Sequence, residues 1–295
     1  MKTLKYISIF SLIIFLVSCR DKITINVGST YVRLVVEGEI TSDTMAHKVR
    51  LTQTEDYFSD KPVQPVSNAI VFITDGLDTF NLTENPLKHG DYYTASNVYG
   101  IAGHTYNLHV NNVNIGNGQS EYVASCYMPT ISKIDSFIII PAKQQRGSAT
   151  EKEWEVDLYA KDPAATKDFY LFKLYYNNTL LSDTLNKLTS TNDDIFNGNN
   201  TNGVSLYYIS NAYRNEQGML FINGGIKHND KFTLELDGVS ESYYNFITQM
   251  QTQYQNANPI FGGPPANASN NMLPADKAVG FFAAYSATRK NYIYK

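Results

Sequence analysis

Cysteine, tryptophan and histidine are scarce in this sequence, and each shortage limits the chemistry that the chain can carry. Two cysteines among 295 residues allow at most one disulfide and no thiolate metal cluster. The five histidines lack the short spacings of zinc sites, since His104 and His109 are expected on opposite faces of one strand. Gly-x-Ser-x-Gly nucleophile motifs and glycine-rich phosphate-binding loops are also missing. We therefore predict a non-enzymatic protein with no catalytic residue, no metal site and no cofactor.

Charged residues are few, and acidic ones outnumber basic ones. Asp, Glu, Lys and Arg make up 18% of the chain, and the formal net charge is −4. An acidic surface repels phosphate backbones, so nucleic acid is not an expected partner. Hydrophobic residues make up 43% of the chain, which is enough to bury a core, so a disordered chain is not expected either.

Long apolar runs are missing as well, and the one mostly apolar run near the start spans residues 7–17 and ends at Ser18-Cys19. As a helix it would reach about 16 Å, roughly half of a bilayer's hydrocarbon layer, so it is too short for a transmembrane helix. Lys2 and Lys5 before the run and the small Ser18 after it complete the layout of a secretory signal. One alternative is an ordinary soluble signal peptide in which Cys19 has no role.

The residues Leu16-Val-Ser-Cys19 also resemble a bacterial lipobox. This resemblance implies cleavage before the cysteine and attachment of lipid to its thiol. Residues 1–18 are then a signal peptide, Cys19 is the lipidation site and residues 19–30 are a tether. Several acyl chains on one cysteine anchor a protein stably, because each buried CH2 contributes about 0.8 kcal/mol. Cys126 then has no disulfide partner, and its strand-like surroundings favour a small buried side chain.

Tyrosine is abundant, and short runs of alternating apolar and polar residues follow one another along the chain. The sequence has 22 Tyr and 15 Phe, which suit strands with one half-wet face. Met128-Pro129 is interpreted as the joint between two domains. We therefore predict a mainly β fold of two β-sandwiches, residues 31–128 and 129–295. The predicted strands are residues 31–40, 66–75, 79–83, 91–95, 104–110, 131–140, 154–161, 169–176, 230–237 and 278–288.

One helix and two polar loops interrupt the second predicted sandwich. Apolar residues at helical spacing follow Ser240, a favourable N-cap, and predict a helix over residues 241–255. Residues 187–203 and 258–274 are rich in polar residues, Gly or Pro and are predicted to be surface loops. Because rigid sandwiches generally bind through their loops, contacts are expected there. The candidate binding residues are Asp193, Asp194, Asn197, Tyr207, Tyr208, Asn258, Pro265 and Asn267.

Three other interpretations of these residues stay open. The adjacent Asp193 and Asp194 could serve a glycosidase, although neighbouring acids in a polar loop are usually solvated. Asp193, Asp194, Asn197 and Asn199 offer oxygen ligands for calcium, but they lack the residue order of an EF-hand. Tyrosines such as Tyr207 could stack on sugar rings or pack in a core.

Several motifs together resemble a known family. In chain order, they resemble uncharacterised Bacteroidota outer-membrane lipoproteins, known as a domain of unknown function and often encoded beside TonB-dependent receptors. The N-terminal motifs are also similar to carboxypeptidase-regulatory-like and transthyretin-like sandwiches. The resemblance implies an immunoglobulin- or transthyretin-like first sandwich and a fibronectin-like second one. The motifs include Leu34-Val-Val-Glu-Gly-Glu-Ile-Thr41, Pro65-Val-Ser-Asn-Ala-Ile-Val71, Gly100-Ile-Ala-Gly-His-Thr-Tyr106, Ile134-Asp-Ser136 and Gly280-Phe-Phe-Ala-Ala-Tyr285.

The family resemblance implies that the protein is anchored by lipid to the outer membrane and displayed on the cell surface. We expect an accessory or ligand-capture partner of a TonB-dependent nutrient transporter, with a glycan or a peptide as ligand. The alternative is a structural or adhesive β-sandwich module of the cell surface. Copurification with a barrel protein favours the first hypothesis, whereas recovery of the lipoprotein alone favours the second.

Overall fold

Strands dominate the described part of the chain. The computed structural model describes residues 32–55, 59–143, 151–164, 166–194, 196–214, 219–255 and 268–295. The predicted signal peptide, Cys19 and the tether lie outside these residues, as do Asn258, Pro265 and Asn267. In these ranges, no helix has the length and apolar character needed to cross a membrane.

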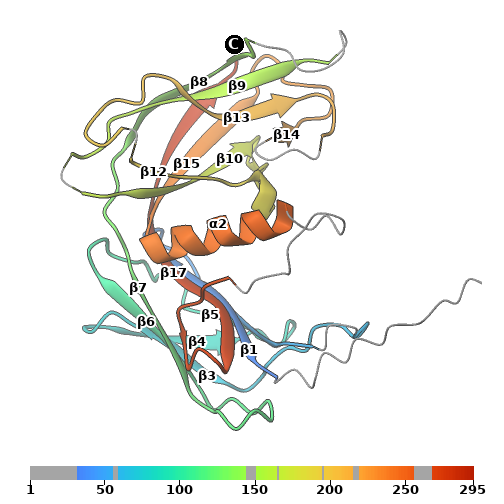
Figure 1. The fold of residues 1–295 in the computed structure, drawn as a ribbon, viewed down its shortest axis with the longest axis vertical. Helices are drawn as coiled ribbons and strands as arrows, with labels where there is room; N and C mark the ends of the chain where they lie inside the picture. The colour runs from blue at the N-terminus through green and yellow to red at the C-terminus, as the bar shows by residue number, and fades with distance from the viewer. Residues whose placement is uncertain are drawn as a thin grey trace, which may run out of the picture. The chain divides into compact units, whose positions relative to one another are not determined.

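The strands pair into a sheet of 13 strands and a sheet of four. The smaller sheet runs β14 (Met219–Phe221), β13 (Val204–Ser210), β9 (Glu153–Ala160), β8 (Ile134–Pro141). In Figure 1 these strands lie above α2 (Glu241–Gln255), and the first strands of the chain lie below it. The predicted mainly β class, with a helix at residues 241–255, is confirmed. The larger sheet runs β11 (Thr179–Leu180), β10 (Phe169–Tyr176), β15 (Lys231–Val239), β17 (Ala278–Ile293), β1 (Leu34–Thr41), β2 (Lys48–Gln53), β5 (Asp91–Tyr93), β4 (Thr79–Glu84), β3 (Ile70–Thr74), β6 (Thr105–Asn111), β7 (Tyr122–Tyr127), β16 (Met272–Leu273), with β12 (Thr189–Asn192) beside β10.

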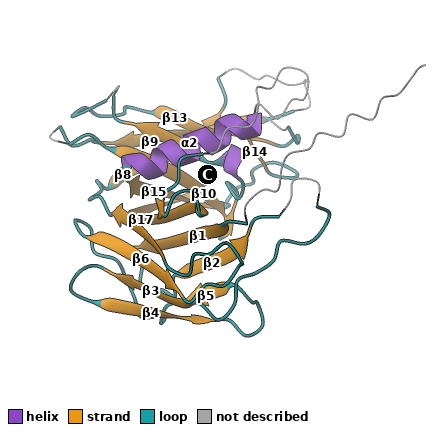
Figure 2. Ribbon diagram, turned by 60° about the horizontal axis from the view of Figure 1, so that its bottom comes forward, coloured by secondary structure: helices purple, strands orange, loops and turns teal. Residues whose placement is uncertain are grey.

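Alternating apolar residues fill two cores. In the first core, one face of β6 buries Tyr106, Leu108 and Val110, as their period of two predicts. β17 contacts β6 and β7 without pairing with them, so the large sheet folds back on itself around this core. The second core lies between the two sheets, where Tyr170 and Phe172 of β10 pack with residues of β8, β9 and β13. Figure 2 shows these three strands stacked over β10 and β15.

β17 connects the two halves of the large sheet. Its first half pairs in parallel with β1, and its second half pairs antiparallel with β15. The contact with β1 is unusually close at Gly280, where a Cβ atom would lie 2.0 Å from the carbonyl oxygen of Val36. Gly280 also has a φ of +102°, which residues with a side chain rarely adopt. The approach of β17 to β1 therefore requires glycine at this position.

α2 begins at the predicted cap and covers part of the large sheet. Ser240 Oγ accepts a hydrogen bond from Tyr243 N at 3.3 Å, which satisfies one of the free N–H groups of the first turn. The rings of Tyr243 and Phe246 lie 5.2 and 5.1 Å from the ring of Phe281 on β17. The helix is thus fixed by its aromatic face rather than by intrinsic helix propensity.

The structure differs from the predicted elements at several strands. β2, β11, β13 and β14 were not predicted, and β17 continues five residues beyond the predicted end at residue 288. β16 lies at the end of the predicted loop 258–274, where Met272 and Leu273 pair with β7. Residues 187–203 were predicted to be a surface loop, but residues 189–192 form β12 and pair with β10. The reason is that hydrogen bonds to β10 satisfy this polar backbone, although the segment contributes few apolar side chains.

A buried charge network links four strands on the α2 side of the large sheet. Lys173 Nζ on β10 lies 2.7 Å from Asp237 Oδ2 and 2.8 Å from Glu235 Oε1, both on β15. Arg289 on β17 binds Glu235 at 2.6 Å, and Tyr285 of β17 donates to Glu39 of β1 at 2.7 Å. Burial raises the pKa of Asp237 to about 7, although the Lys173 ammonium group opposes this shift. The fully buried Asp237 thus holds a proton more tightly in the folded chain than in the unfolded one.

We expect Gly280→Ala to destabilise the protein by at least about 3 kcal/mol, because the methyl group must displace the β1 backbone. Gly76→Ala is the matched control, since Gly76 also has a positive φ but open space around its Cβ position. It should cost about 1 kcal/mol. Urea unfolding measures both values, and equal losses would show that the β1 contact is unimportant.

Asp237 should make stability depend on pH. An acid whose pKa is higher in the folded state stabilises that state at low pH, and this stabilisation is lost as the pH rises through the folded-state pKa. Relative to Asp237→Asn, the wild-type unfolding free energy should therefore fall between about pH 5 and pH 7, by up to about 1.4 kcal/mol per pH unit. Asp135→Asn, at an exposed position, should leave the wild-type slope unchanged. Denaturant unfolding across this range tests the claim, which parallel curves for wild type and Asp237→Asn would contradict.

Candidate functional site

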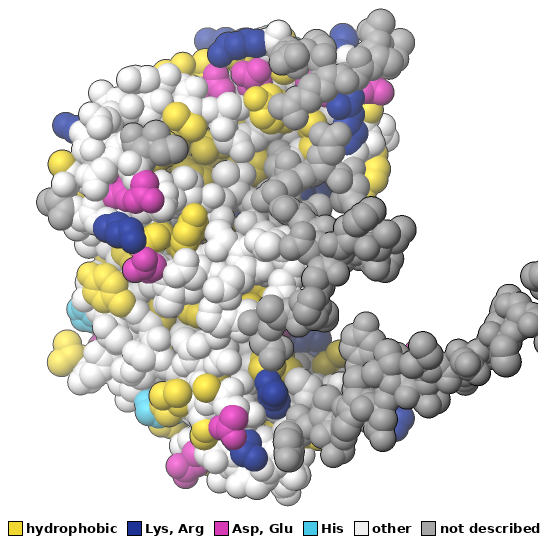
Figure 3. Space-filling view, in the orientation of Figure 1, with side chains coloured by type: hydrophobic (Ala, Val, Ile, Leu, Met, Phe, Trp, Pro, Cys, Tyr) yellow, Lys and Arg dark blue, Asp and Glu magenta, His cyan; other side chains and the backbone are white. Residues whose placement is uncertain are grey.

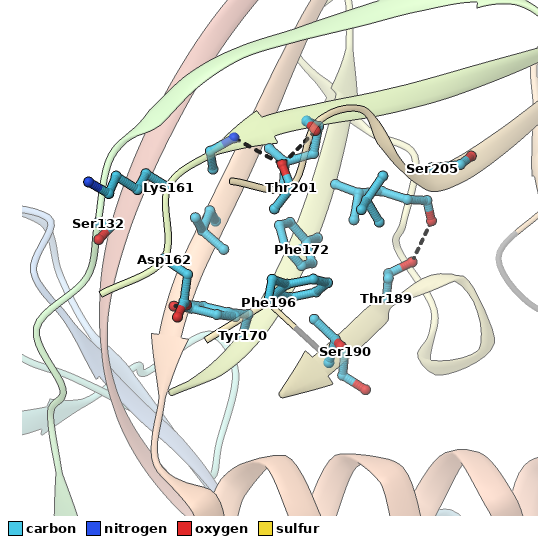
Figure 4. A pocket seen from close by; sticks show the side chains of 16 residues that line it. Ser132, Lys161, Asp162, Tyr170, Phe172, Thr189, Ser190, Phe196, Thr201 and Ser205 are labelled. Carbon is cyan, nitrogen blue, oxygen red and sulfur yellow. Dashed lines mark hydrogen bonds between the residues drawn. The ribbon is translucent and has the colours of Figure 1, made fainter. Parts of the chain in front are cut away.

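A cavity of 290 Å³ lies between the two sheets, beside β12. Its floor is apolar, with Phe172 and Leu236 from the large sheet and Leu158 from β9. Hydroxyl groups surround this floor, and Figure 4 shows Tyr170, Phe172 and Phe196 close together with Thr189, Ser190 and Thr201 around them. This combination of an apolar floor and a polar rim is typical of small-molecule sites. The remaining lining residues are Ser132, Ala160, Lys161, Asp162, Thr191, Val204, Ser205 and Leu206.

The polar insert at residues 187–203 forms one wall of the cavity because it is held on two sides. Thr189 Oγ1 donates to the carbonyl oxygen of Leu206 on β13 at 3.1 Å. Thr201 Oγ1 donates to the carbonyl oxygen of Leu158 on β9 at 2.7 Å and accepts from the N–H of Ala160 at 3.0 Å. These side-chain hydrogen bonds add to the backbone bonds that Thr201 N and Gly203 N donate to β9, so the insert is held without a large apolar contribution.

α2 holds the same insert from below. The amide of Gln251, which is buried, donates to the carbonyl oxygens of Leu185 and Leu188 at 2.9 Å each. Leu185 belongs to a short 3-10 turn, η1 (Leu185–Lys187), and Leu188 directly precedes β12. The position of the cavity wall is therefore fixed by β9, β13 and α2 together.

Three aspartates gather beside the cavity, and one of them, Asp162, lines it. One carboxylate oxygen from each of Asp162, Asp168 and Asp193 lies within 4.8 Å of the others. Asp162 and Asp193 are buried, and Asp168 is half-buried. They follow β9, precede β10 and follow β12 respectively, so the group assembles only when all three strands are in place.

Hydrogen bonds orient the carboxylates of this group. Asp162 accepts from the Tyr170 hydroxyl through Oδ1 and from Gly198 N at 3.1 Å through Oδ2. Asp193 Oδ2 accepts from Asp168 N at 2.9 Å. Burial is the first cause that raises the pKa of the Asp168 carboxyl, and the charges of Asp162 and Asp193 raise it further. Burial and the bond to Asp162 raise the pKa of Tyr170, so its hydroxyl remains a donor.

The predicted binding residues lie in or beside the acidic group, on β13, or outside the described residues. Asp193 lies in the acidic group, whereas Asp194 and Asn197 are exposed beside it. Tyr207 is fully buried, and its hydroxyl donates to the carbonyl oxygen of Phe172 at 2.5 Å, which is a packing position rather than a contact surface. Tyr208 is half-buried on β13. The other three candidates lie outside the described residues.

Asp162, Asp168, Tyr170 and Phe196 were not among the predicted site residues. Asp162 and Asp168 flank a short connection that begins with Pro163. Two acids at the ends of a turn are only a weak indication of a binding site when a single sequence is read. Phe196 was hidden in the polar insert, where it is the one aromatic residue between 187 and 203. A solitary aromatic side chain in a polar segment could have indicated a packed wall instead of a free loop.

The surface gives no sign of a charged binding face in the view of Figure 3. Among the described residues on that face, acidic and basic side chains are scattered between uncharged ones. A continuous basic surface, as nucleic-acid binding requires, is not formed there. The candidate site is therefore a partly open, mostly uncharged cavity with an acidic group beside it.

A family model with the description "Domain of unknown function (DUF4249)" matches residues 20–291. The matched range includes both cores, the cavity and the three aspartates. Among curated proteins, none matches this chain.

We expect Tyr170→Phe to reduce the unfolding free energy by about 1.5–3 kcal/mol, because a buried carboxylate loses its hydroxyl donor. Tyr99→Phe is the control at an exposed tyrosine and should change the unfolding free energy by less than about 0.5 kcal/mol. Chemical denaturation compares the two variants. A Tyr170→Phe protein as stable as the control would show that this hydrogen bond does not hold the acidic group.

Proposed function

This chain belongs to the family described as a domain of unknown function (DUF4249), and we propose that it is a non-enzymatic lipoprotein that captures a small ligand at the outer membrane. It acts as an accessory to a TonB-dependent nutrient transporter and is anchored through lipid on Cys19. The cavity beside β12 is the main support for a role in ligand capture. The lipobox-like residues Leu16 to Cys19 and the resemblance to Bacteroidota lipoproteins support the location.

The size and lining of the cavity suit one apolar group of a peptide. Small-molecule sites usually have volumes of about 300–1,000 Å³, so 290 Å³ accommodates a side chain rather than a long oligomer. Phe172 is 2% exposed and Tyr170 is 8% exposed, so these rings enclose a guest instead of offering a flat surface for sugar stacking. Hydroxyls of Ser190 and Thr191 at the rim can bond to the polar backbone of such a peptide.

A structural or adhesive cell-surface module is the alternative function. The large sheet favours it, since β17 pairs with strands of both halves and joins the two cores into one continuous structure that suits a spacer. Such a module needs no small ligand and no transporter, so the two functions differ in what remains bound after extraction from the membrane.

Extraction of the full chain from its native membranes in mild detergent should recover a TonB-dependent barrel and a small peptide with it. Cys19→Ser should leave the chain in the soluble fraction, because the lipid anchor is lost. Val204→Trp, which fills the cavity, should remove the peptide but keep the barrel. Mass spectrometry of the purified material measures all three results.

Val123→Trp is the matched control, since Val123 is exposed on β7, away from the cavity. It should keep both the barrel and the peptide. Recovery of the wild-type lipoprotein alone would contradict the transporter role. Equal peptide content in Val204→Trp and wild type would contradict the assignment of the cavity.

A further inference from the structure

The acidic group at Asp162, Asp168 and Asp193 has more negative charge than its surroundings neutralise. In the part of the chain that the structure describes, none of the three forms an ion pair with Lys, Arg or His. Lys167 is adjacent to Asp168 in the chain, but its exposed ammonium group pairs with Glu241 at 3.0 Å and acts on Asp193 only beyond ion-pair distance. Buried carboxylates normally have a cationic partner, because taking a charge out of water is costly.

One fully buried oxygen of the group has no hydrogen-bond donor. Asp193 is 1% exposed, and its Oδ1 has no hydrogen-bond donor, whereas its Oδ2 accepts from Asp168 N. The two oxygens of Asp162 each have a donor, and Asp168 Oδ2 accepts from the Thr166 hydroxyl at 2.6 Å. A buried carboxylate oxygen without a donor, beside two more carboxylates, has the character of an unfilled coordination position.

We propose that Asp162, Asp168 and Asp193 bind a divalent cation, and that this cation is calcium. Calcium binds oxygen ligands at about 2.3–2.6 Å, so ligands on opposite sides of the ion are about 4.6–5.2 Å apart. The three oxygens lie within 4.8 Å of one another, which is inside this span. Magnesium requires shorter bonds and keeps several waters, for which two buried aspartates leave little room.

The hydrogen bonds around the aspartates have the arrangement of an outer coordination layer. The Tyr170 hydroxyl and Gly198 N bind Asp162, and the Thr166 hydroxyl binds Asp168. Partners of this kind orient carboxylates toward a metal ion.

The cation would fix the cavity wall. It joins the end of β9, the start of β10 and the end of β12. The carbonyl oxygen of Asp193 also accepts from the N–H groups of Phe196 and Asn197 at 2.9 and 2.8 Å. Phe196 lines the cavity, so calcium binding holds this ring in the wall. The site itself does not depend on the proposed transport role.

Isothermal titration of the full chain in detergent, after treatment with a chelator, tests the proposal with calcium chloride as the probe. The wild type should bind one ion with a Kd between about 10 μM and 1 mM. Asp193→Asn should weaken this binding by more than about tenfold. Asp194→Asn is the matched control at the adjacent exposed acid and should leave the Kd within about threefold.

Thermal unfolding separates a lost ligand from a damaged fold. At a hundredfold excess of calcium over Kd, the wild-type Tm should rise by about 5 °C or more, and that of Asp193→Asn should not. Without calcium, Asp193→Asn should be at least as stable as the wild type, because a buried charge is removed. A wild type that shows neither heat nor a Tm shift with millimolar calcium would overturn the proposal. So would an Asp193→Asn variant that binds calcium as the wild type does.

Discussion

The parallel pairing of β1 with β17 is the constraint on which the rest of the structure depends. It joins a strand at the start of the described chain to one at its end, and it requires the close backbone approach at Gly280. The same strand pairs with β15, which carries one wall of the second core. Both cores therefore share a continuous backbone ladder, and the cavity between the sheets keeps its position relative to the first core.

The cavity is built mainly by polar side chains, which explains why an Asn- and Thr-rich insert can form a wall. Thr189, Thr201 and Gln251 satisfy backbone groups of β13, β9 and the segment before β12. This arrangement fixes the insert without a large apolar contribution from it. The free-energy cost of burying polar groups falls mainly on the aspartates. Burial raises the pKa of Asp168, and one buried oxygen of Asp193 has no donor. The proposed ligand capture and the proposed cation binding both depend on this one wall.

Sequence patterns were sufficient to predict those elements whose buried face follows from the spacing of neighbouring residues. Ser240 and the apolar spacing after it predicted α2, and the alternation of Tyr106, Leu108 and Val110 predicted β6. The site was harder to predict, because its residues come together through long-range pairing. Asp193 was singled out, but its partners Asp162 and Asp168 are 31 and 25 residues away in the chain, which no local period can reveal. β12 was missed for the same reason, since its stability comes from β10.

The shared ladder can be tested most directly by following the two cores separately during unfolding. Trp154, the single tryptophan, lies in the second core, and Cys126 lies in the first. In a Cys19→Ser chain, tryptophan fluorescence and the reactivity of the Cys126 thiol can be measured against the same denaturant series. We predict coincident midpoints, because β17 makes both cores unfold together. Two separate transitions would contradict the account and show that the cores are independent.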